Sequence, residues 1–438
     1  MTGGGGPLVQ LRERLQAAGR VPGGSVLLRN GRILAASAVL AAGLGALFWL
    51  LAARWFTAAA VGRSYALLSA AMLLATLGSL NLGDVLVRFL PTAGVRGRWL
   101  VMRCYGVAAG TSAAVAVGFV LLADRISPGL TDLREPLSAV LFVVATAGYA
   151  VFVLQDGALT GLRRPGWVLA ENLVFAVAKA LGLALCAALA VAAGILLSWA
   201  AGLALAVALA NAVLFARALP AARHSGGGAP DRGRPRAMAR YAAADYVGQL
   251  GQVAVSKSLP LLVLARLGAE QTAYYSLAYL VTDTLYQAAY SMGQSLTVEG
   301  AAEPERLAEH ARRMLWHTAA LITPAAAVTV VAAPWILRLF GADYAEHGTT
   351  VLRLMALSAV PNVLFGVAVH VARVRQALTF LTGLQLAFAA LLLALVLVLM
   401  PRHGLAGVGA AWLATASLLA LVLAATAPRW LPSGRPRA

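Results

Sequence analysis

Charged residues are scarce in this chain, and acidic residues are the scarcer kind. Only 12% of the 438 residues are charged, with 35 Lys plus Arg against 17 Asp plus Glu, whereas a soluble domain averages about 25%. Hydrophobic residues make up 61% of the chain, and they form runs of about 20 residues, the length that crosses a bilayer. The composition excludes an ordinary soluble domain and predicts an all-α protein that crosses a membrane many times.

Cysteine is almost absent as well. Cys104 and Cys186 are the only two, and both fall in expected membrane helices or at their ends, which argues against a disulfide, a zinc site or a catalytic thiol. No phosphate-binding or dinucleotide motif follows a strand, and the histidines are scattered. The longest outer loop (124–136) is too short for an active site. We therefore expect no enzyme activity, no metal and no cofactor.

The net charge of +18 would suggest nucleic-acid binding in a soluble protein. Here the arginines lie in short segments between apolar runs, so we exclude a nucleic-acid partner. Twelve such runs are present; with the N-terminus inside, 25 arginines fall on the inner side and 8 on the outer side. By the positive-inside rule this predicts a multi-pass protein of the cytoplasmic (inner) membrane with both termini cytoplasmic.

One Gly-, Pro- and Arg-rich segment divides the apolar runs into six and six. The predicted organisation is an N-terminal cytoplasmic segment, a six-helix bundle, a cytoplasmic linker, a second six-helix bundle and a cytoplasmic tail. Their bounds are 1–32, 33–217, 218–239, 240–427 and 428–438.

The two halves resemble each other where their first and second spans connect. Residues 51–68 align without gaps on 263–280, so that Arg54 meets Arg266 and Ser64 meets Ser276. An even number of spans in each half gives both halves the same orientation, which predicts a parallel repeat.

Polar residues form stripes on the seventh and eighth spans. Steps of three or four residues keep each stripe on one helical face. The seventh span carries Asp245, Gln249, Gln252 and Ser256, and the eighth carries Tyr279, Asp283, Tyr286, Gln287 and Tyr290. Such faces are costly against lipid and indicate a water-accessible cavity, with hydrogen bonding between helices as the alternative.

Lysine is used only twice, both times inside an apolar run. Lys257 lies beside the seventh-span stripe, at a depth similar to that of Asp283 on the neighbouring span. A structural ion pair is one interpretation, and a pair that opens onto the cavity is the one we favour. Lys179 lies in the fifth span, where packing or snorkelling is the alternative to a binding role. Asp156 and Glu171 are expected to frame a cytoplasmic entrance.

Several motifs resemble one known family. "LNLGDVLVR" (80–88) and "LGAEQTAYYSLAY" (267–279), together with Asn30, Gly62 and Tyr65, are similar to motifs of the polysaccharide-transporter branch of the multidrug/oligosaccharidyl-lipid/polysaccharide (MOP) exporter superfamily. The resemblance implies a MATE-like fold of two six-helix bundles that expose the cavity to each side in turn. It also implies that the chain flips an oligosaccharide attached to a lipid.

Two departures from the family limit the resemblance. The seventh span has Ser256, Lys257 and Ser258 where relatives often place acids or amides. The drug-exporter branch tends to rely on acids in the first or seventh span, and here the first span has none.

The predicted function is therefore a flippase for a polyprenyl-diphosphate-linked oligosaccharide, a precursor of cell-surface polysaccharide. The expected partners are this lipid-linked substrate, membrane lipids and a coupling ion, H⁺ or Na⁺. Lys257, Lys179 and Arg88 would bind the diphosphate, while Asp245, Asp283, Asp156 and Glu171 would pair with cations or serve in coupling. The alternative is an ion-coupled exporter of drugs or other amphiphiles, and a third hypothesis is a membrane glycosyltransferase or polymerase.

Overall fold

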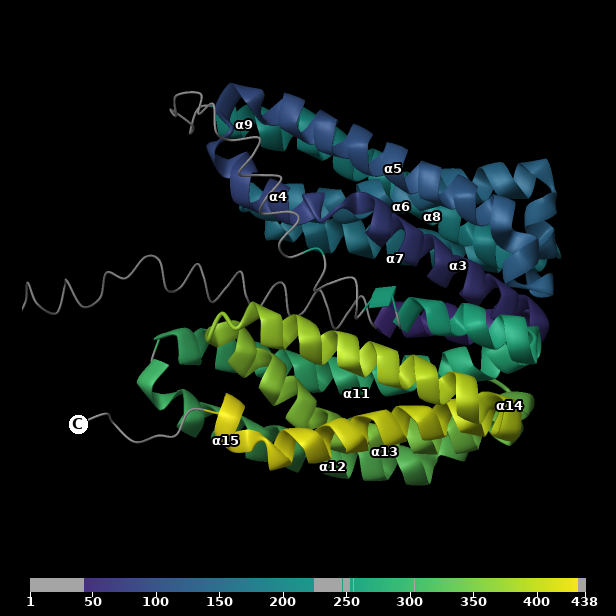
Figure 1. The fold of residues 1–438 in the computed structure, drawn as a ribbon. Coiled ribbons are helices and arrows are strands. Elements are labelled where there is room, and N and C mark those ends of the chain that lie inside the picture. The colour runs from purple at the N-terminus through teal and green to yellow at the C-terminus, as the bar shows by residue number, and fades with distance from the viewer. Residues whose placement is uncertain (1–42, 224–245, 247–252, 255, 303, 432–438) are drawn as a thin grey trace, which may run out of the picture.

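The computed structural model describes residues 43–223, 246, 253, 254, 256–302 and 304–431, and these residues are almost entirely helical. We use the name N-lobe for the bundle of helices from α3 to α9, and C-lobe for helical residues 256–267 with the helices from α11 to α15. Figure 1 shows the two lobes side by side. A further helix, Gly43–Trp55, precedes the N-lobe.

The helices of the N-lobe are α3 (Ala58–Ser79), α4 (Leu82–Phe89), α5 (Gly97–Ile126), α6 (Pro136–Gly161), α7 (Pro165–Ala188), α8 (Gly194–Val213) and α9 (Leu219–Arg223). A π-helical turn, Leu214–Ala218, joins α8 to α9. Those of the C-lobe are α11 (Ala269–Ala302), α12 (Leu307–Arg338), α13 (Ala342–Val374), α14 (Leu378–Ala425) and α15 (Ala427–Trp430). Short 3₁₀ turns, including Pro128–Arg134, fill several connections.

Eight helices of the described part are long and apolar enough to cross a membrane. α14 holds 48 residues, about 72 Å of helix, which is more than twice the bilayer core of about 30 Å. It consists of two helices joined at Gly404, whose φ of 55° and ψ of −135° are not helical. The expected all-helical membrane fold is confirmed, while the count of twelve spans and the side of the termini stay predictions.

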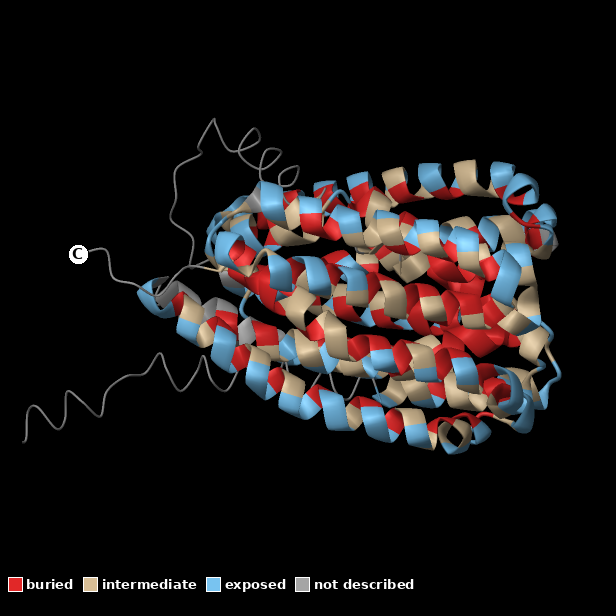
Figure 2. Cartoon of the chain, turned by 60° about the horizontal axis from the view of Figure 1, so that its bottom comes forward, coloured by how far each residue is buried: buried red, intermediate tan, exposed pale blue. Residues whose placement is uncertain are grey.

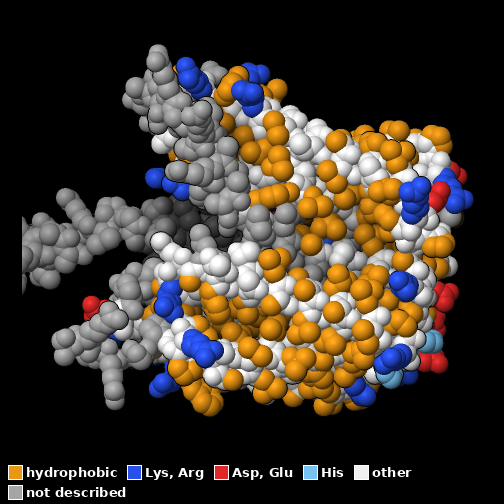
Figure 3. All heavy atoms as spheres, in the orientation of Figure 1, with side chains coloured by type: hydrophobic (Ala, Val, Ile, Leu, Met, Phe, Trp, Pro, Cys, Tyr) orange, Lys and Arg blue, Asp and Glu red, His pale blue; other side chains and the backbone are white. Residues whose placement is uncertain are grey.

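The outer surface matches a bilayer. Hydrophobic side chains cover the middle of the face in Figure 3, whereas Lys and Arg gather toward the two ends of the helices. Exposed tryptophans fall near helix ends, as in Trp55 and Trp335 at one end and Trp99 and Trp167 at the other. Tryptophan favours the interface between hydrocarbon and water, so this pattern frames a membrane-spanning band.

The ends of the molecule differ in charge. The arginine-rich end holds α4, α9 and α15 (Figure 1) and carries Arg88, Arg223 and Arg429. The positive-inside rule predicts that this end is cytoplasmic. We refer to the other one as the opposite end.

Close packing between α3 and α11 joins the lobes near the opposite end. A side chain at Gly62 would collide with the backbone of Ala269, so glycine is required for this approach. Arg54 adds a polar link: its Nε donates to the Leu339 carbonyl at 2.6 Å, at the end of α12. Away from that end the lobes are further apart, as Figure 1 shows.

Buried residues concentrate in the interior of the helical assembly, with exposed ones on its outer helices (Figure 2). One hydrophobic cluster draws Phe48, Phe175 and Trp199 from the N-terminal half and Tyr275 and Trp412 from the C-lobe. The two segments aligned in the sequence, 51–68 and 263–280, each fold as a helix end, a short turn and a new helix. The repeat of the two halves stays a prediction.

Candidate functional site

A cavity of about 360 Å³ lies among the helices of the C-lobe. Its polar and aromatic lining comes from five chain segments that are distant in the sequence. The residues concerned are Ser256, Tyr279, Asp283, Tyr286, Gln287, Tyr290, Asn362, Phe365, Gln385, Phe388 and Trp412. Five of the predicted site residues, all on α11, therefore line one cavity.

The five α11 residues that line the cavity are called the α11 stripe. They recur every three or four positions and therefore share one face of the helix. The Tyr286 hydroxyl lies 2.6 Å from the Ser358 Oγ on α13, which holds the phenol in place. The Trp412 ring, on α14, stacks on Tyr286 with centroids 5.6 Å apart and approaches Tyr279 at 5.9 Å. Phe388 meets the same indole edge-on at 6.0 Å. These rings form a continuous aromatic wall.

Asp283 is the acidic residue among the side chains that line this cavity. Tyr279 and Gln287 lie within hydrogen-bonding reach of its carboxylate, and Lys257 interacts with it electrostatically. Tyr65 of α3 is also near enough to sense the Asp283 charge, which places this part of the cavity at the boundary between the lobes. Lys257 and Asp283, which the sequence places at similar depth, thus lie near enough to interact, while their role stays a prediction.

A second cation lies at the arginine-rich end of the cavity. Arg373, in the last turn of α13, donates from Nη1 to the Tyr290 hydroxyl at 2.8 Å. Its guanidinium carbon lies 5.6 Å from the Tyr290 ring centroid. Tyr290 follows Asp283 by seven residues, about 10 Å along α11. Two cations thus contact lining residues of α11, Lys257 at Asp283 and Arg373 at Tyr290, although neither cation itself lines the cavity.

The other predicted cations lie elsewhere. Lys179 Nζ is held over two aromatic rings, 5.1 Å from the Phe48 centroid and 4.6 Å from that of Phe175. Such cation–π contacts stabilise a desolvated ammonium. Arg88 is exposed at the end of α4, with its guanidinium 5.8 Å from the Phe89 ring. Among the described residues, neither side chain lines the C-lobe cavity.

Three predicted residues, Asp245, Gln249 and Gln252, lie outside the described part of the chain.

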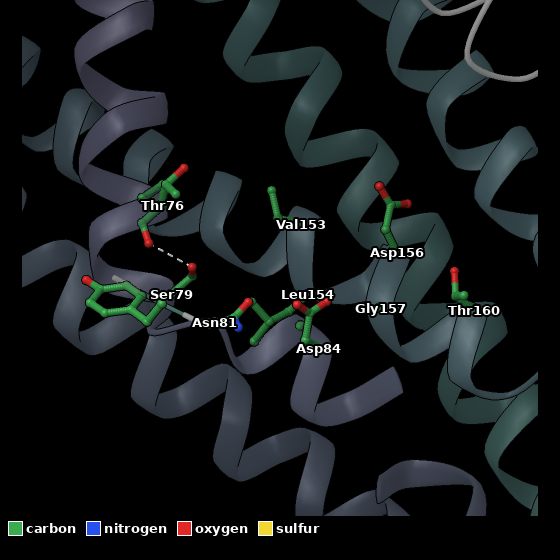
Figure 4. A pocket seen from close by; sticks show the side chains of 12 residues that line it. Thr76, Ser79, Asn81, Asp84, Val153, Leu154, Asp156, Gly157 and Thr160 are labelled. Carbon is green, nitrogen blue, oxygen red and sulfur yellow. Dashed lines mark hydrogen bonds between the residues drawn. The ribbon is translucent and has the colours of Figure 1, made fainter. Parts of the chain in front are cut away.

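The N-lobe has an acidic pocket of its own, with a volume of about 290 Å³. Figure 4 shows Asp84 reaching it from α4 and Asp156 from α6. α4 and α6 approach closely because Gly83 and Gly157 face each other without side chains. The Tyr246 hydroxyl donates to the Leu77 carbonyl at 2.5 Å and borders the same pocket. Asp156, predicted at an entrance, thus lines a pocket of the N-lobe that Tyr246 of the second half borders.

Sequence reasoning missed part of the C-lobe cavity. Asn362 follows Pro361 inside α13, and a proline in a helix interior gave a local signal. Gln385 is an isolated amide in an apolar run. The sequence does not distinguish Trp412 and Phe388 from the other hydrophobic residues of a membrane helix. Arg373 entered the sequence analysis only as one of the 25 arginines on the inner side of the membrane. None of the five could be assigned to the cavity without knowing which helices pack against α11.

Comparison with known proteins identifies the fold. Residues 253–400 match the MatE family, and no curated protein matches the chain in sequence. The structure resembles an inward-facing multidrug resistance MATE family transporter of the MOP superfamily, with TM-score 0.66 and 13% identity over 87% of this chain and 92% of that one. An outward-facing transporter of the same description gives TM-score 0.56 and 14% identity over 89% and 92%.

A lipid II flippase, MurJ in an inward closed conformation, is also similar, with TM-score 0.62 and 12% identity over 90% of this chain and 87% of that one. The fold is therefore that of membrane transporters of the MATE type within the MOP superfamily, and the chain is a multi-pass membrane protein. The expected MATE-like architecture is confirmed at the level of the fold. The polysaccharide branch of the superfamily stays a proposal.

Proposed function

We propose that this protein is a flippase for a polyprenyl-diphosphate-linked oligosaccharide. The observation that carries the proposal is the C-lobe cavity. Aromatic rings around Trp412 and amide side chains line it, and two cations, Lys257 and Arg373, interact with its lining residues Asp283 and Tyr290. Specific ligand sites combine apolar and aromatic walls with a few well-placed polar groups. MurJ, described as a lipid II flippase, has a similar fold and is compatible with this function.

Each part of such a substrate meets a matching feature. Sugar rings can lie against Tyr286 and Trp412 while Asn362 and Gln385 hydrogen-bond their hydroxyls. The diphosphate requires cations, which Lys257 and Arg373 supply through charge-assisted hydrogen bonds. The polyprenyl tail stays in the bilayer between the lobes. Lys179 and Arg88, which do not line the cavity, would act only after the lobes move.

The second candidate function is ion-coupled export of drugs or other amphiphiles. Two similar structures are described as multidrug resistance transporters, and the N-lobe contains two membrane-embedded acids, Asp156 and Glu171. Against it, the first span has no acid at all, and the cavity is rich in amides and hydroxyls rather than purely apolar.

Substitution of Lys257 tests the flippase function. If its ammonium binds and then releases a phosphate, both Lys257→Ala and Lys257→Arg should fold yet transport poorly, because arginine stays charged and binds phosphate in a forked geometry. We expect at least about a tenfold loss of transport in both, corresponding to about 1.4 kcal/mol. The measurement is delivery of labelled lipid-linked oligosaccharide to the outer leaflet of proteoliposomes, normalised to folded protein.

The alternative role of Lys257 predicts a different pattern. A purely structural partner of Asp283 would be replaced well by arginine, while alanine would lower the folded yield, since breaking a buried pair costs about 3–5 kcal/mol. Full transport by Lys257→Ala would refute the substrate role. Export of cationic drugs by the wild-type protein, without movement of lipid-linked sugars, would favour the second candidate function.

A further inference from the structure

The connection from α4 to α5 carries four exposed arginines at the arginine-rich end. Arg88 lies in the last turn of α4, and Arg96 ends the 3₁₀ turn Gly94–Arg96. Arg98 and Arg103 lie in the first two turns of α5. All four side chains are exposed, and residues 88–103 contain no acid. We use the name basic patch for the exposed side chains of residues 88–103.

The basic patch also exposes large apolar side chains. Leu90 is 2% exposed and packs in a hydrophobic cluster of the N-lobe, which fixes the backbone of the connection. Val95 and Trp99 point the other way and are 78% and 58% exposed, and Met102 is exposed as well. Trp99 and Met102 are three residues apart on α5 and therefore share one side of the helix. Arginines and apolar groups thus alternate on one surface.

Two of the arginines are held against aromatic rings. The guanidinium carbon of Arg103 lies 4.8 Å from the ring centroid of Trp99, and that of Arg98 lies 5.7 Å from the ring centroid of Phe215. A guanidinium stacked on a ring keeps its N–H groups at its edge, where they can bind an anion in a forked geometry. Among the described residues, no acid forms an ion pair with Arg96, Arg98 or Arg103.

The segments outside the described part of the chain carry the wrong charge to cover this patch. Residues 1–42 contain five arginines and one glutamate, and residues 224–245 contain four arginines and two aspartates. Residues 432–438 add two arginines and no acid. Like charges repel each other, so a matching negative charge has to come from outside this chain.

The patch is continuous with the apolar outer face of α5. Trp99 and Val117 are 18 residues apart, which is five helical turns, so both lie on the same face. Val117 and Leu121 are exposed there. α5 packs on α3 and α6 and lies on the side of the N-lobe away from the C-lobe (Figure 1). Tryptophan favours the boundary between hydrocarbon and headgroups, and arginines grouped beside a membrane helix attract anionic lipids.

We propose that the basic patch is a binding site for an anionic phospholipid. Arg96 and Arg103 bind the headgroup phosphate on either side of Trp99, and the acyl chains run along the exposed face of α5 from Trp99 toward Val117. The stacking of Arg103 on Trp99 orients the guanidinium before the lipid arrives. Because the site lies away from the C-lobe, it anchors the N-lobe in one leaflet and is separate from the C-lobe cavity.

Native mass spectrometry of the full-length protein in detergent tests the site. Phosphatidylglycerol should bind more tightly than phosphatidylcholine with the same acyl chains. Arg96→Gln and Arg103→Gln should each weaken phosphatidylglycerol binding about fivefold, and together about 25-fold, because each basic residue near an anionic headgroup contributes about 1 kcal/mol. The matched control is Arg125→Gln, an exposed arginine in the last turn of the same helix, which should leave the affinity unchanged.

Trp99→Ala tests the apolar part of the site. It should also weaken phosphatidylglycerol binding, because it removes the surface on which Arg103 is stacked and part of the contact with the acyl chains. Substitutions of exposed side chains usually change stability by no more than about 0.5 kcal/mol, so we expect all four variants to fold.

Three results would overturn the lipid site. The first is equal affinity for the two lipids, and the second is equal phosphatidylglycerol binding by the wild type and the double arginine variant. The third is displacement of the lipid by an equal concentration of a soluble competitor. Glycerol phosphate as that competitor would mean that the phosphate alone is recognised, and polyglutamate would assign the patch to an acidic protein. Lipid binding is measured without transport, so a failure of the flippase function would leave this site standing.

Discussion

At the residue scale, Trp412 organises the candidate site. Its indole contacts Tyr279, Tyr286 and Phe388, and it is itself 6% exposed. A large ring held by three neighbours loses little conformational freedom when a ligand binds, which favours its use as a rigid surface. The polar groups around it, such as Gln287 and Asn362, can then select among ligands by hydrogen bonding.

Arg373 offers a residue-scale test of anion binding. Arg373→Gln should reduce transport of the lipid-linked oligosaccharide by about 10- to 100-fold, because a charge-assisted hydrogen bond contributes about 1.5–3 kcal/mol. Arg375→Gln is the matched control: Arg375 lies at the same helix end, but its Nη1 donates to the Trp430 carbonyl at 2.7 Å, away from the cavity. Proteoliposome transport would measure both, and equal losses would contradict a specific role for Arg373.

At the scale of elements, the contact of α3 with α11 closes the opposite end. Gly62 packs against the Ala269 backbone, and Arg54 bonds the carbonyl at the end of α12. Carbonyls at the end of a helix lack partners within the helix and attract cations. Glycine on α3 and arginine before it therefore hold one lobe to the other by close packing and by a charge–dipole contact.

Gly62→Ala should weaken this closure. Its added Cβ cannot fit while α3 touches Ala269, so the lobes should separate at the opposite end. Spin labels at Glu135 and Glu346, both exposed near that end, would report a longer distance by pulsed EPR in a cysteine-free background. Gly110→Ala is the control because nothing lies within 4 Å of its added Cβ. An unchanged distance in a folded Gly62→Ala protein would refute the closure role.

At the scale of the whole molecule, the lobes are joined at the opposite end and lie further apart toward the arginine-rich end (Figure 1). The TM-score is 0.66 with an inward-facing transporter and 0.56 with an outward-facing one. Separation of the lobes at the opposite end would require the contacts of Arg54 and Gly62 to break.

The topology prediction also belongs to this scale. With twelve spans and both termini inside, reporter fusions at Ser225 and at Pro436 should both give a cytoplasmic signal. The physical reason is the retention of arginine-rich loops on the cytoplasmic side during insertion. A matched fusion at His403, next to Gly404 of α14, should give an external signal. Any reversal among the three sites would contradict twelve spans.

Much of this protein can be predicted from composition and periodicity. Long apolar runs require helices in a bilayer because every backbone group must be hydrogen-bonded within its own segment. The three- and four-residue steps of Tyr279, Asp283, Tyr286 and Tyr290 determine that they share one face of α11. Local spacing also determines that Lys257 and Asp283 lie at similar depth, since each position follows from the rise per residue.

Only the tertiary structure decides which faces meet. Asn362, Gln385 and Trp412 join the α11 stripe because α13 and α14 pack beside it. Lys179 lies over the rings of Phe48 and Phe175 instead of lining the C-lobe cavity. In a bilayer nearly every helix face is apolar, so hydrophobic periodicity does not specify partners. Close packing of small residues and a few polar contacts between helices select them, and these act between positions that are distant in the sequence.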